Sequence, residues 1–448
     1  MTSPQLPPNP QLWPQRTRVA GGTWSLDGVP LADIAEEFGT PSFVLDVATL
    51  RARAQRYRKA FVDAFAGMEV DVYYASKAFS SKAVLRWMHQ EGLGVDVASL
   101  GELVTALQGP VPAERLGLHG NNKSDEELEL AVRTGVGRII VDSFSEIDRV
   151  AAVAADHGVR QDVLVRVTTG VHAGGHDFIA TAHEDQKFGL SLASGAARTA
   201  LDRIYQRPEL RLRGLHSHIG SQIQDGAGFA AAAQALLGLR AEFAADTGYA
   251  LPEVDLGGGF GVAYTPGEDE LDIEATAAEL ARVVREHGTD EDLPLPAVSF
   301  EPGRAIIAPA MFTLYRVGTC KPVQLDDGAS RLYVSVDGGM SDNLRPALYQ
   351  ADYHAEVISR DVPGPAVAAR VVGMHCESGD IVVHNVDLPE QVRRGDLLAV
   401  PVTGAYGRSM ASNYNLLPRP GVVAVQDGSA WEIVRRETID DLLALDLG

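Results

Sequence analysis

The chain has 448 residues, enough for two domains or for one large barrel with an appended domain. Its formal net charge of -21 at pH 7 argues against a general nucleic-acid surface and against an anionic-membrane surface. Only two cysteines occur, which is too few for a disulfide framework and compatible with a reducing cytoplasm.

The amino-terminal residues, Met1 to Pro8, contain neither a basic segment nor an apolar stretch, so they do not predict a secretory signal. No uncharged apolar run reaches the length of a membrane span. We therefore expect a cytoplasmic protein that begins with a loose proline-rich arm of roughly 15 residues. The apolar run Pro41–Asp46 would be a strand too many for the barrel predicted next, so we expect it to pair with a β-rich domain.

Between about residues 48 and 310, short apolar runs alternate with segments of helical period, which is typical of repeated βα units around a parallel sheet. Eight runs predict strands at Val70–Tyr74, Val95–Ala98, Leu116–His119, Arg138–Val141, Val163–Val167, Leu212–His216, Val254–Leu256 and Ala297–Phe300. Helices are expected at Ser80–Gln90, Leu100–Gln108, Asp125–Thr134, Ser145–His157 and Phe229–Thr247. The α/β pattern favours a (β/α)8 barrel with its active site at the carboxyl ends of the strands; a doubly wound open sheet is the alternative.

After about residue 310 the apolar period becomes strand-like, and strands are expected at Phe312–Val317, Leu332–Val336, Ala368–Met374, Ile381–His384, Leu397–Val402 and Val422–Val425. We therefore predict a β-rich domain over residues 311–448, joined by the strand within residues 1–47. The segment Gly170–Lys187 is rich in glycine and histidine and is expected to form a mobile loop over the barrel mouth.

Lys77 is expected to project from the carboxyl end of the first barrel strand, because it directly follows the run Tyr73-Tyr74-Ala75-Ser76. Desolvation at the mouth of a barrel would disfavour the ammonium form, and a neutral amine can react with an aldehyde or ketone. From this motif alone, a lysine that extends its charged end to solvent is the alternative.

Two strand-end turns suit an anionic ligand that carries a ring. The glycines Gly257, Gly258 and Gly259 follow the seventh predicted strand, where backbone amides can approach a phosphate, although glycine clusters also form ordinary turns. Glu301 and Arg304 follow the eighth strand. A carboxylate can keep a ring nitrogen protonated and a guanidinium can bind an anionic substrate group; a structural salt bridge is the alternative.

The pair His216 and His218 ends the sixth predicted strand, and such an alternation is also compatible with a metal site. The other strand ends do not carry a further set of histidines and aspartates that would complete one. We therefore expect no metal here, and none at His172, His176 and His183 of the glycine-rich loop. For His218 we favour an imidazole stacked on an aromatic cofactor.

Three stretches of the β-rich domain carry polar groups. Cys376 begins a turn that also holds a carboxylate and a hydroxyl, and Arg345 and Tyr349, four residues apart, could bind a carboxylate. Tyr406 lies among small residues, which suits a phenol placed against a ligand. Taken singly, these residues are equally compatible with an inert cysteine, an ordinary surface and an aromatic ring packed in a turn.

Six motifs occur in one order: Tyr-Ala-Ser-Lys-Ala, His-x-His-Ile-Gly-Ser, Gly-Gly-Gly-Phe, Glu-Pro-Gly-Arg, Cys-Glu-Ser-Gly-Asp and Gly-Ala-Tyr. With them, residues from about 20 to 440 resemble the diaminopimelate decarboxylase family of alanine-racemase-like (fold type III) pyridoxal phosphate enzymes. The resemblance implies a barrel with a β domain, pyridoxal 5'-phosphate as cofactor, and decarboxylation of meso-2,6-diaminopimelate to L-lysine and CO2, the last step of lysine biosynthesis. It also implies a homodimer with active sites at the subunit interface.

The resemblance also implies roles for matching residues. Lys77 is similar to the lysine that binds the cofactor covalently, Glu301 to the partner of the ring nitrogen, and His218 to the imidazole stacked on the ring. Cys376 is similar to the acid that protonates the carbanion from across the dimer interface. Further cofactor contacts are expected at Asp96, Ser221, Gly258, Gly259, Gly303, Arg304 and Tyr406, and substrate contacts at Arg304, Arg345, Tyr349, Glu377, Ser378 and Tyr406. Phe79 stands where the family motif has asparagine.

Three other functions stay open at this point. A related decarboxylase could act on ornithine, arginine or carboxynorspermidine, but Arg345 and the Cys376 turn argue against ornithine, which has no distal carboxylate. A non-catalytic regulatory homologue would have no chemical need to keep Lys77, Glu301 and Cys376 together. A metal-dependent barrel hydrolase is the third alternative, and bound zinc would favour it.

Overall fold

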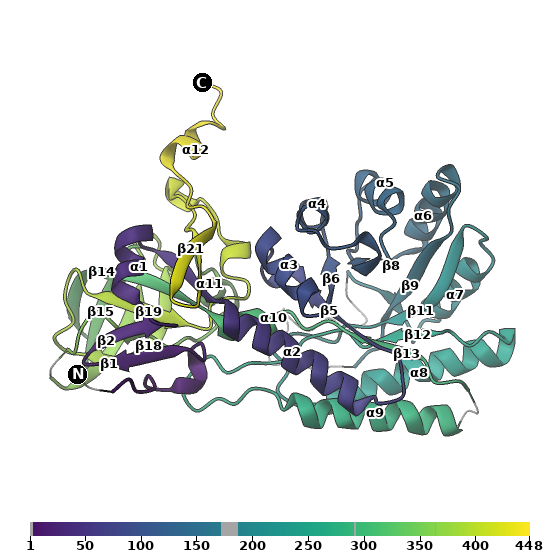
Figure 1. Cartoon of the computed structure of the whole chain (residues 1–448), viewed down its shortest axis with the longest axis horizontal. Helices are drawn as coiled ribbons and strands as arrows, with labels where there is room; N and C mark the ends of the chain where they lie inside the picture. Colours follow the sequence, from purple (N-terminus) through teal and green to yellow (C-terminus); the bar gives the residue numbers. More distant parts are fainter. Residues whose placement is uncertain (1–2, 172–186, 291–292, 363) are drawn as a thin grey trace. The chain divides into compact units, whose positions relative to one another are not determined.

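The computed structural model describes residues 3–171, 187–290, 293–362 and 364–448, and the chain divides into two compact units (Figure 1). The barrel unit comprises Ala54–Gly261 and Glu270–Ala305. The β unit comprises Met1–Arg53, Val262–Asp269 and Ile306–Gly448. The short segment Val262–Asp269 packs with the β unit, which the sequence pattern did not predict.

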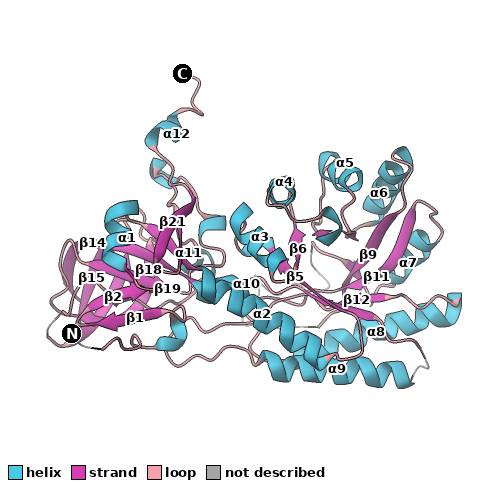
Figure 2. Ribbon diagram, in the orientation of Figure 1, coloured by secondary structure: helices cyan, strands magenta, loops and turns pink. Residues whose placement is uncertain are grey.

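Eight parallel strands form a closed ring in the barrel unit. Figure 2 distinguishes strands, in magenta, from helices, in cyan. Their order is β9-β11-β12-β13-β5-β6-β7-β8, and β8 pairs with β9 to close the ring. The strands are β5 (Val70–Ala75), β6 (Gly94–Val97), β7 (Leu116–Leu118), β8 (Arg138–Val141), β9 (Gln161–Thr168), β11 (Leu210–His216), β12 (Glu253–Asp255) and β13 (Ala297–Phe300). The predicted (β/α)8 barrel is thus confirmed, and the open-sheet alternative is wrong. A short strand, β10 (Leu190–Ser191), adds to β9.

Helices follow the strands around the barrel: α3 (Lys82–Gln90), α4 (Leu100–Gln108), α5 (Asp125–Thr134), α6 (Phe144–Asp156), α7 (Ala196–Tyr205), α8 (Ala227–Thr247) and α9 (Ile273–Asp290). Four of them begin the same way, because the hydroxyls of Ser81, Ser99, Ser124 and Ser143 each accept the amide N–H three residues later. Such caps satisfy donors that the first helical turn leaves free. They explain why α3 to α6 start within two residues of their predicted positions.

Aromatic rings pack the outside of the barrel near β13. The ring of Phe61, in helix α2 (Val47–Ala64), stacks on Phe300 at 3.6 Å between centroids. Phe260 packs against Phe229 of α8 at 5.0 Å, and all four side chains are buried. Burial of rings of this size is a major stabilising contribution to a fold.

The β unit is built on a mixed sheet in the order β18-β17-β15-β14-β4-β20-β21, with β19 pairing with β14 and β16. Its strands are β4 (Ser42–Asp46), β14 (Met311–Gln324), β15 (Ser330–Val336), β16 (Glu356–Val357), β17 (Ala366–Val372), β18 (Ile381–Pro389), β19 (Leu397–Pro401), β20 (Val422–Gln426) and β21 (Ser429–Val434). The early strand β4 pairs antiparallel with β14 and parallel with β20. It therefore lies inside the sheet, where both its faces are buried.

Most of residues 3–11 are exposed, as expected of a loose arm, but the segment packs against neighbouring surface from Leu12 on. Leu12 and Trp13 are buried, and the Trp13 ring contacts Trp24 edge-on at 4.9 Å and Phe312 at 5.8 Å. The segment continues into β1 (Thr17–Ala20), β2 (Thr23–Leu26), β3 (Val29–Pro30) and α1 (Leu31–Phe38). The proline-rich composition concealed two large apolar side chains whose burial can order this region.

The remaining helices are short. Helix α10 (Arg304–Ile307) follows β13, α11 (Arg345–Tyr349) carries two of the predicted substrate contacts, and α12 (Ile439–Leu443) lies near the carboxyl terminus with no buried residue. Across the described part of the chain, every helix is too short or too polar to cross a membrane.

Candidate active site

A pocket of about 170 Å³ opens among the carboxyl ends of the barrel strands. Its wall includes Lys77, Asp96, His119, Arg166, His218 and Glu301, which come from six different strands or the turns after them. Of these, sequence reasoning named Lys77, Asp96, His218 and Glu301 as site residues. It missed His119 and Arg166, although His119 ends a predicted strand and the same strand-end argument could have selected it.

Lys77 lies in the turn after β5, as expected, but its side chain is exposed. The desolvation that we expected for this amine is therefore absent, because the pocket mouth leaves it in contact with solvent. Phe79, two residues on, is buried, and its carbonyl accepts a hydrogen bond of 2.8 Å from the hydroxyl of Tyr74. The residue that departs from the family motif thus helps to close the turn that carries Lys77.

Glu301 lies deep in this pocket between two imidazoles. Its Oε1 is 3.2 Å from Nε2 of His119 and 3.0 Å from Nε2 of His216. Nε2 of His119 is also 3.3 Å from Oδ1 of Asp96. All four side chains are buried, yet Oε1 of Glu301 and both carboxylate oxygens of Asp96 lack an aligned hydrogen-bond donor among the described residues. The cluster is therefore charged, close-packed and incompletely hydrogen-bonded.

The charges in this cluster are strongly coupled. Burial opposes the cationic form of His119, but the attraction of Glu301 and Asp96 outweighs it and raises the pKa of His119 to about 9. Burial and the negative charge of Glu301 raise the pKa of Asp96 to about 7. Burial also opposes ionisation of Glu301, yet His216 and His119 hold its pKa well below the usual value. Burial lowers the pKa of His216 below its usual value, although the carboxylate of Glu301 opposes this shift.

His218 stands beside the glycine-rich turn, as its predicted role requires. Its Nδ1 accepts a hydrogen bond of 3.4 Å from the amide of Gly258. Burial, together with the positive charges of Lys77 and Arg166, lowers the pKa of His218 well below the usual value. A neutral, half-buried imidazole can therefore face a ligand in the pocket.

The glycine-rich turn follows β12, where only glycine fits. A Cβ at Gly258 would lie 2.1 Å from the carbonyl oxygen of Glu301, and one at Gly259 would lie 2.4 Å from that of Gly220. Gly259 also has a φ of +115°, and at Gly303 a Cβ would come 2.9 Å from the carbonyl oxygen of Ala75. These close backbone approaches leave the turn free of side chains, which suits a phosphate.

Arg304 and Ser221 meet beside this turn. Nη2 of Arg304 donates a hydrogen bond of 2.7 Å to Oγ of Ser221, and the guanidinium is buried. A hydroxyl that already accepts from a cation can still donate to an anion. Arg304 and Ser221 belong to different motifs, and both are predicted cofactor contacts. In the structure they contact each other directly.

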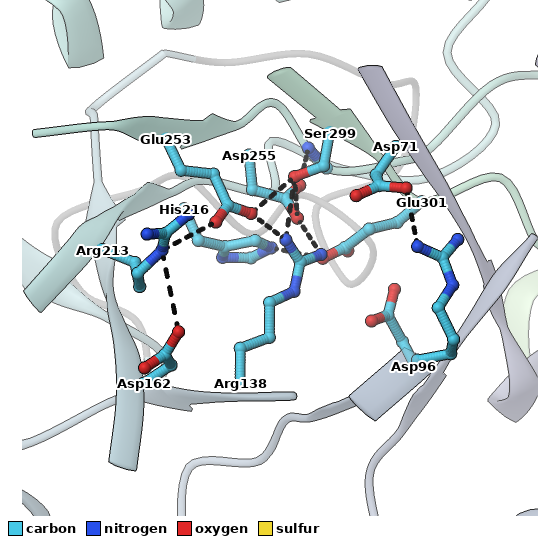
Figure 3. A network of polar contacts seen from close by, with 12 residues as sticks. Asp71, Asp96, Arg138, Asp162, Arg213, His216, Glu253, Asp255, Ser299 and Glu301 are labelled. Atoms are coloured by element: carbon cyan, nitrogen blue, oxygen red, sulfur yellow. Dashed lines mark hydrogen bonds and ion pairs between the residues drawn. The ribbon is translucent and has the colours of Figure 1, made fainter. Parts of the chain in front are cut away.

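A buried arginine supports the pocket from inside the barrel (Figure 3). Arg138 starts β8, and its Nη2 donates a hydrogen bond of 2.6 Å to Asp255 at the end of β12, while Nη1 contacts Glu253 and donates at 3.0 Å to Ser299. The other oxygen of Asp255 accepts the amide N–H of Gly257 at 2.8 Å. Arg138 thus crosses the barrel interior and fixes the carboxylate that begins the glycine-rich turn; sequence reasoning did not find it.

In the β unit, Arg345 and Tyr349 lie on α11. The Arg345 guanidinium is buried, donates to the hydroxyl of Tyr353, and stands 4.5 Å from the centre of the Tyr264 ring. Tyr349 is half-buried. Two aromatic rings therefore fix the direction of this cation.

The turn that begins at Cys376 lies on the surface, and Cys376, Glu377 and Ser378 are all exposed. Asp380 fastens the turn from below, because its two carboxylate oxygens accept the amides of Met340 at 2.6 Å and His375 at 2.7 Å.

The side chain of His375 binds two further segments of the β unit. Its Nε2 is 2.8 Å from Oγ of Ser341, and its Nδ1 is 2.9 Å from Oδ1 of Asn415. Sequence reasoning included Asp380 in the motif of this turn without a role, and it missed His375, whose side-chain partners lie far away in the chain. Tyr406, the remaining predicted contact, is half-buried with a φ of +61°.

Metal binding was considered for the histidines. His172, His176 and His183 lie outside the described residues. Ligand-type atoms of His119, His216 and Glu301 lie within 4.8 Å of one another, so the geometry of this cluster could also accept an ion. Among the described residues, this group of His119, His216 and Glu301 is the candidate metal site to test.

Comparisons with known proteins identify the family. The family model described as "Pyridoxal-dependent decarboxylase, pyridoxal binding domain" matches residues 47–308. The chain is 50% identical over 443 residues to diaminopimelate decarboxylase of Mycobacterium tuberculosis (strain ATCC 25618 / H37Rv), covering 98% of each chain. It is 44% identical over 426 residues to that of Bacillus subtilis (strain 168), covering 95% of each.

Solved structures agree with this assignment. Diaminopimelate decarboxylase of M. jannaschii in complex with L-lysine superposes with a TM-score of 0.89 at 31% identity, over 97% of this chain and 98% of that one. The Helicobacter pylori enzyme complexed with L-lysine gives a TM-score of 0.83 at 29% identity, over 93% and 98%. The chain therefore belongs to the diaminopimelate decarboxylase family of pyridoxal-phosphate-dependent enzymes.

Proposed function

We propose that the protein decarboxylates meso-2,6-diaminopimelate to L-lysine and CO2 in the cytoplasm, as the last step of lysine biosynthesis. The observation that carries this proposal is the barrel pocket, where the amine of Lys77, the imidazole of His218 and the carboxylate of Glu301 converge. A pyridine aldehyde needs an amine to bind it, a flat partner for its ring and a carboxylate for its ring nitrogen.

The residues present fit pyridoxal phosphate. The buried Oε1 of Glu301, which lacks an aligned donor, could accept the N–H of a protonated ring nitrogen. Gly258 and Gly259, with the hydroxyl of Ser221 and the guanidinium of Arg304, would bind the phosphate, and Gly303, which packs closely on Ala75, is assigned to the cofactor with them. Asp96 lies in the same pocket wall. We also assign Tyr406 to the cofactor and the substrate.

Each residue would have a distinct task. When bound to the substrate amine, pyridoxal phosphate accepts the electron pair left behind by CO2. Glu301 would keep a proton on the ring nitrogen, which makes the ring a better acceptor. Lys77 would hold the cofactor before substrate arrives and then give way to the substrate amine. His218, being neutral, would lie against the ring without adding charge.

Substrate choice would depend on the distal amino-acid group of diaminopimelate, which carries both charges. Its carboxylate is assigned to Arg304, Arg345 and Tyr349, and its ammonium to Glu377 with Ser378. Leaving either charge buried without a partner would be strongly unfavourable. The fixed guanidinium of Arg345 supports this assignment, since a directed cation favours a substrate with a second carboxylate.

We assign the final proton to Cys376 of a second copy of the chain. Its thiol is exposed, and so are three apolar side chains close to it or to Asn415, the hydrogen-bond partner of His375. Met374 is 52% exposed, Tyr414 42% and Leu416 69%. The rings of His375 and Tyr414 stack at 5.1 Å, so these segments form one surface. An apolar surface around a catalytic thiol suits an interface between two copies.

The first test is an absorption spectrum of the purified protein in the near-ultraviolet and visible range, before and after addition of meso-diaminopimelate, with CO2 and lysine measured in parallel. The proposal expects a cofactor band that shifts on mixing, with both products formed. A band without turnover would direct the search to ornithine, arginine or carboxynorspermidine. The absence of a band after reconstitution with pyridoxal phosphate would refute the assignment of Lys77.

The shared site has its own test. Inactive Lys77→Ala and Cys376→Ala proteins are mixed under conditions that exchange subunits, and exchange is verified by mass spectrometry of the mixed dimer. Partial recovery of activity is expected, because one of the two sites in a mixed dimer then has both residues. No recovery in verified mixed dimers would place each Cys376 in the site of its own subunit.

A further inference from the structure

The cluster beneath the cofactor pocket contains one imidazole for which the proposed reaction has no stated task. His119 follows β7, is buried, and stands between two carboxylates, 3.2 Å from Oε1 of Glu301 and 3.3 Å from Oδ1 of Asp96. Asp96 lies in β6, whereas His119 and Glu301 directly follow β7 and β13, so three different strands bring these side chains together. A buried histidine that contacts two acids is arranged to carry a charge.

The backbone makes room for this arrangement. Gly117 in β7 faces the carboxylate of Asp96, and a Cβ at that position would lie 2.5 Å from Oδ1. Any larger residue would push Asp96 away from His119. Figure 3 shows Asp96, His216 and Glu301 in the same region of the barrel interior as Arg138.

We propose that His119 is a positioning residue that acts through Glu301, and that Asp96, His119 and Glu301 form a charge triad that holds the proton on the cofactor's ring nitrogen. Two carboxylates and one imidazolium leave one negative charge in a buried site. A protonated ring nitrogen neutralises it, whereas an unprotonated ring would leave it unbalanced. His119 also keeps Glu301 ionised, so that the proton stays on the ring and does not move to the carboxylate.

Other charged or titratable groups around Glu301 do not replace His119. They are His216 and Asp255 on β11 and β12, Arg138 and Arg166 on β8 and β9, and Lys77 and His218 at the pocket mouth. Burial lowers the pKa of His216, whereas two carboxylates raise that of His119, and Arg138 is engaged by Glu253 and Asp255. His119 is thus the imidazolium in direct contact with both Asp96 and Glu301.

The sign of the pH dependence follows. His119 is cationic below a pKa of about 9, and Asp96 is ionised above a pKa of about 7, so the triad carries its single negative charge between these limits. Replacing His119 by glutamine keeps a donor amide but removes the cation. Two neighbouring carboxylates then resist ionisation, and the acidic limb of the pH profile moves to higher pH. Replacing Asp96 by asparagine has the opposite effect, because Glu301 then ionises at lower pH.

The experiment is a pH titration of the cofactor absorbance in holoenzyme, followed by the pH dependence of kcat and kcat/KM. For His119→Gln we expect the acidic limb of the absorbance titration to move up by about one pH unit or more, which is about a tenfold change in the protonation equilibrium. We also expect the alkaline limb near pH 9, assigned to His119, to disappear. For Asp96→Asn we expect the acidic limb to move down. The equilibrium affinity of the apoprotein for pyridoxal phosphate is measured at the same pH values.

His157→Gln is the matched control, because His157 also pairs with a glutamate, at 2.7 Å from Glu129, but at the surface. A native-like His119→Gln protein whose absorbance titration coincides with that of the control would overturn the proposal. If His119→Gln does not fold, the Asp96→Asn variant is the deciding test. An acidic limb that stays in place or moves to higher pH in that variant would also overturn the proposal. Stoichiometric metal at the cluster in place of cofactor would also overturn it.

The inference rests on the proposed use of pyridoxal phosphate in this pocket but not on the identity of the substrate. A wild-type protein that shows the cofactor band and does not decarboxylate diaminopimelate would contradict the proposed function. The absorbance titration would still test the triad in that protein, because it needs only bound cofactor. The two failures are therefore distinguishable.

Discussion

The barrel unit and the β unit present their functional groups in opposite ways. In the barrel, Asp96, His119 and Glu301 are buried and are held by strands and by one another. In the β unit, Cys376 and Glu377 are exposed on a turn that Asp380 and His375 fasten from below. The groups that we assign to the cofactor are thus pre-organised within one unit, whereas Cys376 and Glu377, which we assign to the final protonation and to the substrate ammonium, lie at a surface.

Breaking the barrel site should have the largest effect. Lys77→Ala removes the amine to which we assign cofactor binding, and we expect the rate of CO2 release to fall by about 10⁴-fold or more. After borohydride reduction, mass spectrometry should find the cofactor attached to the wild-type protein and not to the variant. Lys59→Ala, at an exposed helical pair with Asp63, serves as the control and should retain both properties. Cofactor attached to the Lys77→Ala protein at another lysine would contradict the assignment.

Loosening the β-unit turn should have a smaller and different effect. Asp380→Asn leaves one of the amides of Met340 and His375 without its acceptor, at a cost of about 1 to 3 kcal/mol to the turn. We expect kcat to fall by about tenfold or more. The affinity for pyridoxal phosphate, assigned to the barrel, should not change.

This prediction separates the two units directly. Steady-state kinetics and a cofactor titration are made on the same preparation, with Asp387→Asn, an exposed carboxylate on β18, as the control. A parallel loss of cofactor affinity in Asp380→Asn would mean that the β-unit turn also organises the cofactor end. The distinction between the two regions would then be wrong.

A third prediction concerns stability and pH in the β unit. Burial raises the pKa of Asp342 from 3.8 to about 7, although it accepts a hydrogen bond of 2.6 Å from Tyr315. Between these values the folded state binds a proton that the unfolded state has lost, so this group makes stability fall as pH rises. The slope is at most about 1.4 kcal/mol per pH unit.

Urea unfolding at several pH values checks this sign. We expect Asp342→Asn to show a flatter dependence than the wild type between about pH 4 and 7. The substitution also removes the acceptor for the amide of Gly339. This loss changes the free energy of unfolding by the same amount at every pH, so it does not alter the slope of stability against pH. Curves that stay parallel throughout would show that Asp342 is ionised in the folded protein.

The smallest expected effect compares two helix caps. Ser124 and Thr438 each form a capping box, at the starts of α5 and α12. Helix α5 buries Leu128, Ala131 and Val132 against the barrel unit, whereas α12 buries no residue. Ser124→Ala should therefore lower the free energy of unfolding by about 1 kcal/mol, and Thr438→Ala should not change it measurably. Equal losses in thermal unfolding would mean that α12 is part of the cooperative fold.

Local signals explain how much of the fold could be predicted. The eight barrel strands lie within two residues of their predicted positions because apolar runs and serine caps are encoded locally. The packing of Trp13 on Phe312 could not be predicted in this way, since nearly 300 positions of the chain separate the two rings. The expected domain limits near residues 47 and 310 stay a prediction.

The site divides in the same manner. Lys77, His218 and Glu301 could be selected because each ends a recognisable strand and belongs to a motif. The exposure of Lys77 could not, because it depends on how the pocket mouth is filled. Nor could His375, whose partners Ser341 and Asn415 come from turns brought together only by the folded sheet.

The arginine that crosses the barrel also limits how this sequence can evolve. Arg138 satisfies two acids, Glu253 and Asp255, which lie more than 100 positions away in the chain. Losing it alone would leave the fully buried carboxylate of Asp255 without its cation, at a cost of about 3 to 5 kcal/mol, whereas the half-buried Glu253 would keep Arg213 at 3.9 Å. A lineage can therefore replace Arg138 only together with its acids, so these positions are expected to change as a group when the family's sequences are compared.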